Sequence, residues 1–306
     1  MKALITGISG FSGRHLVNLL EKEGITVTGI DRSDNKYKRV DLTDKKELVA
    51  TLTEEKPDYI FHLASPLIRT DQLIDQALID NLKVDLLGTV NLIEAAALLK
   101  TKPKILITGT NAEYQASQQP ISEDTPLKPL TGYGLSKLTQ ELVGKTLADS
   151  YDLEVVTTRT FHLIGPGQSP GFVVTDFCRQ IALMEVNKAK PEITVGNTLI
   201  RRDFTDVRDA VSAYLLLMQK GKSGETYNVC TGTNFSLEEI INKLKDLAKT
   251  DFKVVSLNNR LRQNDPDSIT GDNKKLKDLG WKPEYDLDTS LKDTLSYWRS
   301  EVKARA

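Results

Sequence analysis

The stretch ALITGISGFSGRHL, from Ala3 to Leu16, decides the fold. It begins as an apolar β-type run, continues through Gly7, Gly10 and Gly13, and ends in the first turns of a helix. A bound diphosphate needs such glycines for a tight turn, for close approach of the backbone and for close helix packing, while the helix N-terminus offers free N–H groups. A tight turn alone would also use glycine. The second strand-like run, which ends at Asp31, favours a dinucleotide-binding unit.

Short β-rich runs alternate with longer segments of helical period through the first half of the chain, which predicts a parallel sheet with crossover helices. The predicted strands are Ala3–Thr6, Thr26–Ile30, Tyr59–Leu63, Lys104–Thr108 and Glu154–Arg159. The predicted helices of this half are Gly13–Glu23, Lys45–Glu54, Val84–Lys100 and Gly134–Asp149. We therefore predict an α/β fold, a doubly wound parallel sheet of the Rossmann type.

The pattern becomes less regular after about residue 165, where the predicted helices are Thr175–Asn187, Val207–Gln219, Leu237–Lys249 and Leu287–Ser300. We interpret this part as a smaller C-terminal α/β cap that binds the substrate. The predicted division is a dinucleotide-binding domain of residues 1–161 with 204–230, and a cap of residues 162–203 with 231–306.

Composition narrows the class of partner. The 306 residues carry 41 Lys and Arg against 42 Asp and Glu, so no global field attracts nucleic acid or an anionic membrane. The two cysteines, Cys178 and Cys230, lack a metal-ligand spacing, which predicts neither a zinc site nor a disulfide framework. No apolar run is long enough to span a bilayer. We expect a soluble, cytoplasmic protein that binds no metal.

The choice of nicotinamide cofactor depends on the residues at the end of the second strand. Asp31 is placed to accept hydrogen bonds from the adenosine ribose and to repel a 2′-phosphate, which favours NAD(H). Arg32 beside it is able to bind that phosphate instead. The sequence leaves NAD(H) and NADP(H) open, with NAD(H) slightly favoured. Asp41 is a candidate for the adenine amino group, or a plain strand-end cap.

The glycine spacing and the later HLAS motif, His62 to Ser65, resemble the extended short-chain dehydrogenase/reductase family, which usually has Ala where Ser65 stands. The resemblance implies a nicotinamide dinucleotide cofactor. Besides the glycines and the acidic residues, the expected cofactor contacts are Phe11, Ser12, Leu42, Leu63, Ala64, Tyr133 and Lys137.

GYGLSK places Tyr133 and Lys137 four residues apart at the start of a predicted helix, so both project from one face. Hydride transfer at a carbonyl carbon requires a proton to move at its oxygen. A neighbouring ammonium, helped by the positive nicotinamide of an oxidised cofactor, would lower the pKa of a tyrosine for this task. Tyr and Lys at this spacing also occur on ordinary amphipathic helices.

The strand KILITGT ends with Thr110 at the carboxyl edge of the predicted sheet, where ligands bind in such folds. Its hydroxyl is suited to hydrogen-bond a substrate oxygen. Together, Thr110, Tyr133 and Lys137 resemble the family's Ser/Thr, Tyr, Lys catalytic triad, with Lys137 also holding the nicotinamide ribose.

The residues after Thr110 bear on the reaction. Family members that are 4,6-dehydratases carry Glu two positions after the Thr, where this chain has Ala112, which exchanges no proton. Glu113 follows, but in an extended segment it would point to the opposite face. Dehydration is therefore disfavoured.

The run RTFHLIGPGQSPGFVVTDFCRQI, Arg159 to Ile181, resembles the family branch that reduces GDP-6-deoxy-4-ketohexoses. His162 stands where that branch has an Asn that commonly contacts substrate phosphate, so it is either a phosphate contact or a packed structural histidine. The resemblance also implies that Arg202 and Arg262 clamp the nucleotide diphosphate, for which paired guanidinium groups are suited, although each would equally serve as a surface ion-pair partner.

The function expected from the sequence is NAD(P)H-dependent reduction of the C4 ketone of a GDP-4-keto-6-deoxy sugar. One alternative is a nucleotide-sugar 4-epimerase or 4,6-dehydratase with tightly bound NAD, and another is a non-enzymatic sensor or scaffold. The resemblance further implies a homodimer through helices near residues 85–99 and 134–149. In that region Asp85 replaces an Asn that the family commonly has, and the sequence assigns it no role.

Overall fold

The structure contains the predicted doubly wound parallel sheet, so the prediction of an α/β fold of the Rossmann type is confirmed. The structure, a computed structural model, describes residues 1–32, 34, 36–66, 74–256 and 266–305. Seven strands pair in parallel in the order β10-β6-β5-β4-β1-β2-β3. Their bounds are β1 Lys2–Thr6, β2 Thr26–Asp31, β3 Lys38–Arg39, β4 Tyr59–His62, β5 Lys104–Thr110, β6 Val155–Thr160 and β10 Thr226–Val229. Each of the five predicted strands is found within two residues of its predicted ends.

Helices cover both faces of this sheet. On one face α1 (Phe11–Lys22) packs beside α7 (Val207–Lys220), and on the other lie α2 (Lys45–Glu55), α4 (Gly88–Ala97) and α5 (Gly132–Ser150). Successive residues of a strand point to opposite faces. Accordingly Ile5 packs in the core beneath α1 and α7, whereas Leu4 packs in the core beneath α2 and α4.

The strand order reverses between β1 and β4, since the chain runs from β1 to β2 and β3 on one side and then crosses to β4 and β5 on the other. In open α/β sheets the crevice at such a reversal binds ligands at the carboxyl ends of the strands. The glycine turn after β1 and Thr110 at the end of β5 both lie at this edge.

The predicted helix over residues 84–100 is divided, which corrects the sequence interpretation. A π-helical turn, η1 (Lys83–Leu87), precedes α4, and it follows a helix that was not predicted, α3 (Ile74–Leu82). Gly88 begins α4 against Leu42, where an added Cβ would lie 3.0 Å from the Leu42 Cβ. A π turn inserts one residue into the helix and is often found at functional sites.

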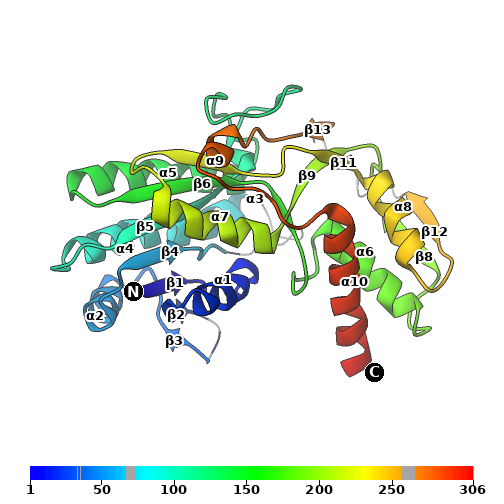
Figure 1. Cartoon of the computed structure of the whole chain (residues 1–306), viewed down its shortest axis with the longest axis horizontal. Helices are drawn as coiled ribbons and strands as arrows, with labels where there is room; N and C mark the ends of the chain where they lie inside the picture. The colour runs from blue at the N-terminus through cyan, green and yellow to red at the C-terminus, as the bar shows by residue number, and fades with distance from the viewer. Residues whose placement is uncertain (33, 35, 67–73, 257–265, 306) are drawn as a thin grey trace.

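The second region of the chain has its own core (Figure 1, right). Strand β9 (Arg201–Asp206) pairs with β7 (His162–Ile164), β11 (Asn234–Ser236) and β13 (Ser268–Ile269), and β8 (Glu192–Val195) pairs with β12 (Lys253–Ser256). Its helices are α6 (Val173–Met184), α8 (Leu237–Leu247) and α10 (Leu287–Ala304), while the short α9 (Lys274–Asp278) packs on β10. These strands, two to six residues long, were not predicted because runs so short show little periodicity.

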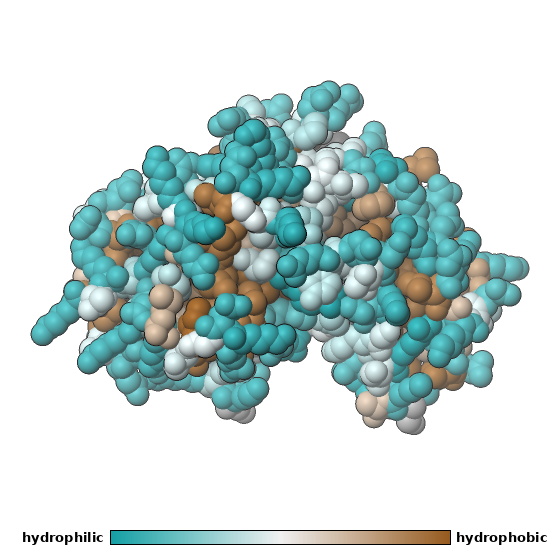
Figure 2. Space-filling view, in the orientation of Figure 1, coloured by the Kyte–Doolittle hydropathy of each residue, from teal (hydrophilic) through white to brown (hydrophobic). Residues whose placement is uncertain are grey.

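Figure 2 shows the surface indented at its lower edge between the two regions, beside α1 on one side and α10 on the other. The domain boundaries stay a prediction, and the boundary between residues 203 and 204 falls inside β9. Among the described residues, none of the helices has the length and apolar character needed to cross a membrane.

Candidate active site

At two positions of the glycine turn after β1, the space next to the backbone is too small for any residue other than glycine. Gly7 has φ +69°, and a Cβ there would lie 2.8 Å from the Ala64 Cα. A Cβ on Gly13 would lie 2.5 Å from the Ile8 carbonyl oxygen. The turn is therefore pressed against the end of β4 and against its own helix.

The N-terminus of α1 fits a bound diphosphate. The residue at the N-cap position of α1 is Gly10, which has no side chain to accept a hydrogen bond from the helix N–H groups. The first turn of the helix contains no acidic residue. The first N–H groups of the helix, beginning at Phe11 and Ser12, therefore have no side-chain acceptor at the cap, and the helix dipole adds partial positive charge. The residues at this turn fit the diphosphate of a dinucleotide.

The acidic residues predicted to contact adenosine differ in their surroundings. The Asp31 carboxylate, at the end of β2, accepts hydrogen bonds from the Ser9 hydroxyl and, at 3.4 Å, from the Ser9 N–H, so it lies at the mouth of the glycine turn. Arg32 beside it is exposed. Asp41 caps the turn that follows it, because its carboxylate accepts from the Thr43 N–H and hydroxyl, and these bonds lower its pKa.

The other predicted cofactor contacts lie around the same edge. Leu42 is buried and packs against the start of α4. The N–H groups of Leu63 and Ala64, which follow β4, donate to the carbonyl oxygen and the hydroxyl of Thr6 at 3.3 and 3.1 Å. The chain therefore passes directly beside the glycine turn as it leaves β4.

The three predicted catalytic residues come together because α5 begins against the end of β5. Thr131 caps α5 by accepting from the Gly134 N–H at 3.0 Å. A Cβ on Gly134 would lie 2.2 Å from the carbonyl oxygen of Ala112, so the first turn of α5 packs directly on the segment after Thr110. This contact places Tyr133 next to Thr110, whose side chain hydrogen-bonds with the tyrosine.

The environment of Tyr133 differs from the expected one. Burial raises the pKa of this half-buried tyrosine, the charges of Asp85 and Glu113 raise it further, and the hydrogen bond with Thr110 lowers it. We expected Lys137 to lower the pKa of Tyr133, but in the protein without a cofactor this pKa is raised. The phenol holds its proton.

Three groups of the protein surround the ammonium of Lys137. Its buried ammonium donates to the carbonyl oxygen of Thr108 at 2.9 Å and to the Gln140 side-chain oxygen at 2.8 Å. It also lies 3.9 Å from the Asp85 carboxylate. The positive charge of Lys137 therefore lies next to a buried carboxylate.

Lys137 is the end of a buried hydrogen-bonded chain that begins at the glycine turn. The His62 imidazole bonds to the Thr6 hydroxyl at 2.8 Å and to the Thr89 hydroxyl at 2.9 Å, and Gln140 donates to Thr89 at 3.0 Å. Burial lowers the pKa of His62 to about 3, so the ring stays neutral. Sequence reasoning missed this chain, although His62 belongs to the quoted HLAS motif.

Glu113 corrects another expectation. Residues Asn111–Glu113 form a short 3₁₀ helix, η2, and not an extended segment, so alternation of side chains does not apply there. The Glu113 carboxylate accepts from the Thr110 N–H at 2.7 Å and lies 3.4 Å from the Arg159 Nε. It is fully buried and fixes the backbone of Thr110.

A buried ion cluster surrounds Glu113. Arg159, in β6, donates to both carboxylate oxygens of Glu141 at 3.0 and 2.7 Å. Burial and the neighbouring charge of Glu141 raise the pKa of Glu113 to about 8, whereas Arg159 and Lys145 hold the pKa of Glu141 below its usual value against the opposing effect of burial. Gly109 makes room for the cluster, since a Cβ there would lie 2.4 Å from a Glu113 oxygen.

The residues predicted to contact the substrate diphosphate lie on the second sheet. His162 begins β7, half-buried, with its ring edge-on to Phe204 at 5.9 Å between centroids. Arg202 is buried in β9 and donates to the carbonyl oxygens of Arg201 and Pro266, both at 2.8 Å. Arg262 lies outside the described residues.

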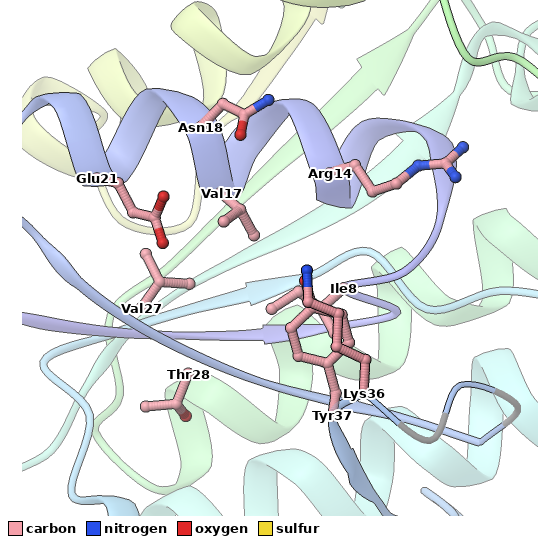
Figure 3. A pocket seen from close by; sticks show the side chains of 9 residues that line it. All are labelled: Ile8, Arg14, Val17, Asn18, Glu21, Val27, Thr28, Lys36 and Tyr37. Carbon is pink, nitrogen blue, oxygen red and sulfur yellow. The ribbon is translucent and has the colours of Figure 1, made fainter.

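A cavity of about 410 Å³ lies beside α1 (Figure 3). It is lined by Ile8, Arg14, Val17, Asn18, Glu21, Val27, Thr28, Lys36 and Tyr37. Arg14 donates to the carbonyl oxygen of Gly167 at 2.8 Å, which ties the start of α1 to the second region. This cavity contains none of the predicted catalytic residues.

The fold, with its glycine turn at the reversal of the strand order, defines a class: a dinucleotide-binding oxidoreductase. Residues 3–230 match the profile of the NAD dependent epimerase/dehydratase family. A curated relative, GDP-6-deoxy-D-mannose reductase from Pseudomonas aeruginosa, is 33% identical over 99% of this chain and 98% of its own length. A UDP-glucose 4-epimerase from Mycolicibacterium smegmatis is 27% identical over 98% of this chain and 99% of its own length.

Among solved structures, that of RMD from Pseudomonas aeruginosa complexed with NADPH superimposes with a TM-score of 0.87 at 31% identity, covering 98% of this chain and 99% of the other. The chain belongs to the NAD dependent epimerase/dehydratase family, the extended branch of the short-chain dehydrogenases/reductases. The predictions of an NAD(P)-dependent enzyme and of its family are thereby confirmed.

Proposed function

We propose that this enzyme reduces the C4 ketone of a GDP-4-keto-6-deoxy sugar with NADH or NADPH. The relative that is 33% identical along nearly its whole length is a GDP-6-deoxy-D-mannose reductase, and a solved structure of similar fold holds NADPH. A further relative, 29% identical over 90% of this chain, is a GDP-6-deoxy-D-talose 4-dehydrogenase, which acts at the same carbon.

The residues present have distinct tasks in this reaction. A reduced dinucleotide whose diphosphate is held at the glycine turn would supply the hydride from its nicotinamide. Tyr133 donates its proton to the ketone oxygen, and Thr110 holds that oxygen by a hydrogen bond. Lys137, fixed by Thr108 and Gln140, orients the nicotinamide ribose.

The observation that carries the proposal is the arrangement of acids around Thr110. Reduction needs one proton donor, and the environment of Tyr133 keeps its proton in place. A dehydratase needs a further acid or base near C5 and C6, but Ala112 has no such group, and Glu113 is directed at the Thr110 backbone and at Arg159. A 4-epimerase uses the same tyrosine and lysine and differs in converting its substrate without added reductant.

The nucleotide is expected to lie across the second region. His162 and Arg202 are the described candidates for its diphosphate, and Arg202 would have to exchange a carbonyl contact for a phosphate oxygen. The Asp31 carboxylate beside the glycine turn favours NADH, while the exposed Arg32 leaves room for the 2′-phosphate of NADPH.

We further infer that the enzyme is a homodimer through α4 and α5. Leu87, Leu135 and Leu142 are large apolar side chains on these helices and the adjoining π turn, and all three are 43–56% exposed. Light scattering of the purified protein is expected to give twice the chain mass, and Leu142→Arg is expected to give a monomer.

The function is tested by supplying GDP-4-keto-6-deoxymannose with NADH or NADPH and following the loss of reduced cofactor. Consumption of one equivalent per ketone is expected, with none when GDP-mannose or UDP-glucose replaces the ketone. If neither cofactor is consumed, the assignment is wrong. If UDP-glucose is converted without added reductant, the epimerase alternative is correct.

A further inference from the structure

Asp85 is a buried acid to which the sequence assigned no role. It lies in the π turn η1, is fully buried, and accepts a hydrogen bond from the Ser136 hydroxyl at 2.8 Å through Oδ2. Its Oδ1 atom is buried without a hydrogen-bond partner and lies 3.9 Å from the Lys137 Nζ.

A carboxylate is costly to bury unless a positive charge compensates it, and Lys137 is that charge. The other acceptors of the Lys137 ammonium, the Thr108 carbonyl and the Gln140 amide oxygen, are neutral. Within the described part of the chain, Asp85 is the one carboxylate within 4.0 Å of Lys137. An Asn at this position would supply a similar shape without the charge.

We propose that Asp85 is a positioning residue that keeps Tyr133 in its protonated, acid form by offsetting the positive charge of Lys137. The inference rests on the proposed function, because a reductase needs a tyrosine that donates its proton. Asp85 acts through Lys137 and through its own field and does not touch the substrate.

Other groups also face Tyr133 and Lys137. Glu113 in η2 and Tyr214 in α7 act on Tyr133 in the same direction as Asp85, and Thr110 in β5 acts in the opposite direction. His62 in β4 faces Lys137 and stays neutral, since burial and the lysine charge both lower its pKa. Asp85 differs from these groups in lying beside both members of the pair.

The test is the pH dependence of kcat/KM for the ketone in wild type and in Asp85→Asn, which keeps the shape and removes the charge. In the variant the lysine charge acts unopposed, so the pKa of Tyr133 falls. The alkaline decline of the reduction rate is then expected about one pH unit lower. At alkaline pH the rate is expected to be about tenfold below wild type, and near wild type at low pH.

Two controls separate charge from structure. Ser136→Ala removes the hydrogen bond to Asp85 and keeps its charge, and it is expected to leave the alkaline decline in place. Asp149→Asn removes an exposed charge at the far end of α5 and is expected to do the same. A profile of Asp85→Asn that superimposes on that of wild type, or a Ser136→Ala profile that moves as far, overturns the proposal.

A second readout does not depend on the substrate. Tyrosinate absorbance of the free enzyme is titrated with and without Tyr133→Phe, and the difference gives the ionisation of Tyr133 alone. Asp85→Asn is expected to lower that midpoint, and an unchanged midpoint overturns the proposal even if the sugar is reduced. If no sugar is reduced but the midpoint falls, the proposed function is wrong, while the effect of Asp85 on the ionisation of Tyr133 is still supported.

If the Asp85→Asn variant does not fold, Asp85→Ser is used in its place for both measurements.

Discussion

Helix α5 carries two buried charged sites one turn apart, and they are built differently. Glu141 is held by Arg159 through two hydrogen bonds of 2.7 and 3.0 Å, in a cluster that also contains Glu113. Lys137 has two neutral acceptors and one carboxylate at 3.9 Å. The first site is closed and stabilises the junction of β5, β6 and α5. The second leaves the Lys137 ammonium with a single, more distant carboxylate, one helical turn from Tyr133.

The largest expected effect concerns the Lys137 site. Tyr133→Phe removes the proton donor and leaves the ring, so turnover is expected to fall about 10²–10⁴-fold. Cofactor binding, measured by fluorescence titration with NADPH, is expected to stay near wild type, because the glycine turn and Lys137 are intact. Turnover within a few-fold of wild type would remove Tyr133 from the mechanism.

The Arg159 site is expected to respond in stability. Arg159→Met leaves the buried Glu141 carboxylate with Lys145 as its cation and removes the cation beside the Glu113 carboxyl group, and the free energy of unfolding is expected to fall by about 3–5 kcal/mol. Arg305→Met breaks the exposed pair with Glu301 and serves as the matched control, with an expected loss of no more than about 1 kcal/mol. Denaturant unfolding measures both. Equal losses would show that the buried cluster is no more important than a surface pair.

A smaller effect is expected in the pH dependence of stability. Because the pKa of folded Glu113 is raised to about 8, the native state binds its proton more tightly than the unfolded chain does. This contribution is present at low pH and is lost as the pH rises toward 8. Relative to Glu113→Gln, the wild-type unfolding free energy is expected to fall by about 1–3 kcal/mol between about pH 5 and pH 9.

Glu185→Gln provides a control of opposite sign. Its hydrogen bonds to Arg299 and the Lys249 N–H outweigh burial and lower the pKa of Glu185, so its contribution is present above the ordinary carboxyl pKa and lost as the pH falls. The difference between wild type and this variant is expected to change only in acid. If Glu113→Gln also changed only in acid, the raised pKa of Glu113 would be refuted.

The same comparison shows what the sequence could predict. The glycine turn, the five strands and the helix bearing Tyr133 and Lys137 follow from local patterns, because each depends on residues close in sequence. The Glu113 cluster joins residues from η2, α5 and β6, which no periodicity connects. Asp85 was noticed only as a departure from the family, since its contact with Lys137 depends on the π turn. The prediction of Glu113 failed because a 3₁₀ turn replaced an extended segment.

The central claim is that hydride is delivered to C4 of a GDP-linked keto sugar. The most direct measurement supplies GDP-4-keto-6-deoxymannose with a reduced nicotinamide cofactor that carries deuterium at its transferable position, and examines the product by NMR and mass spectrometry. The product is expected to carry one deuterium, bound at C4 of a GDP-6-deoxyhexose. A product without deuterium, or with deuterium at another carbon, would contradict it.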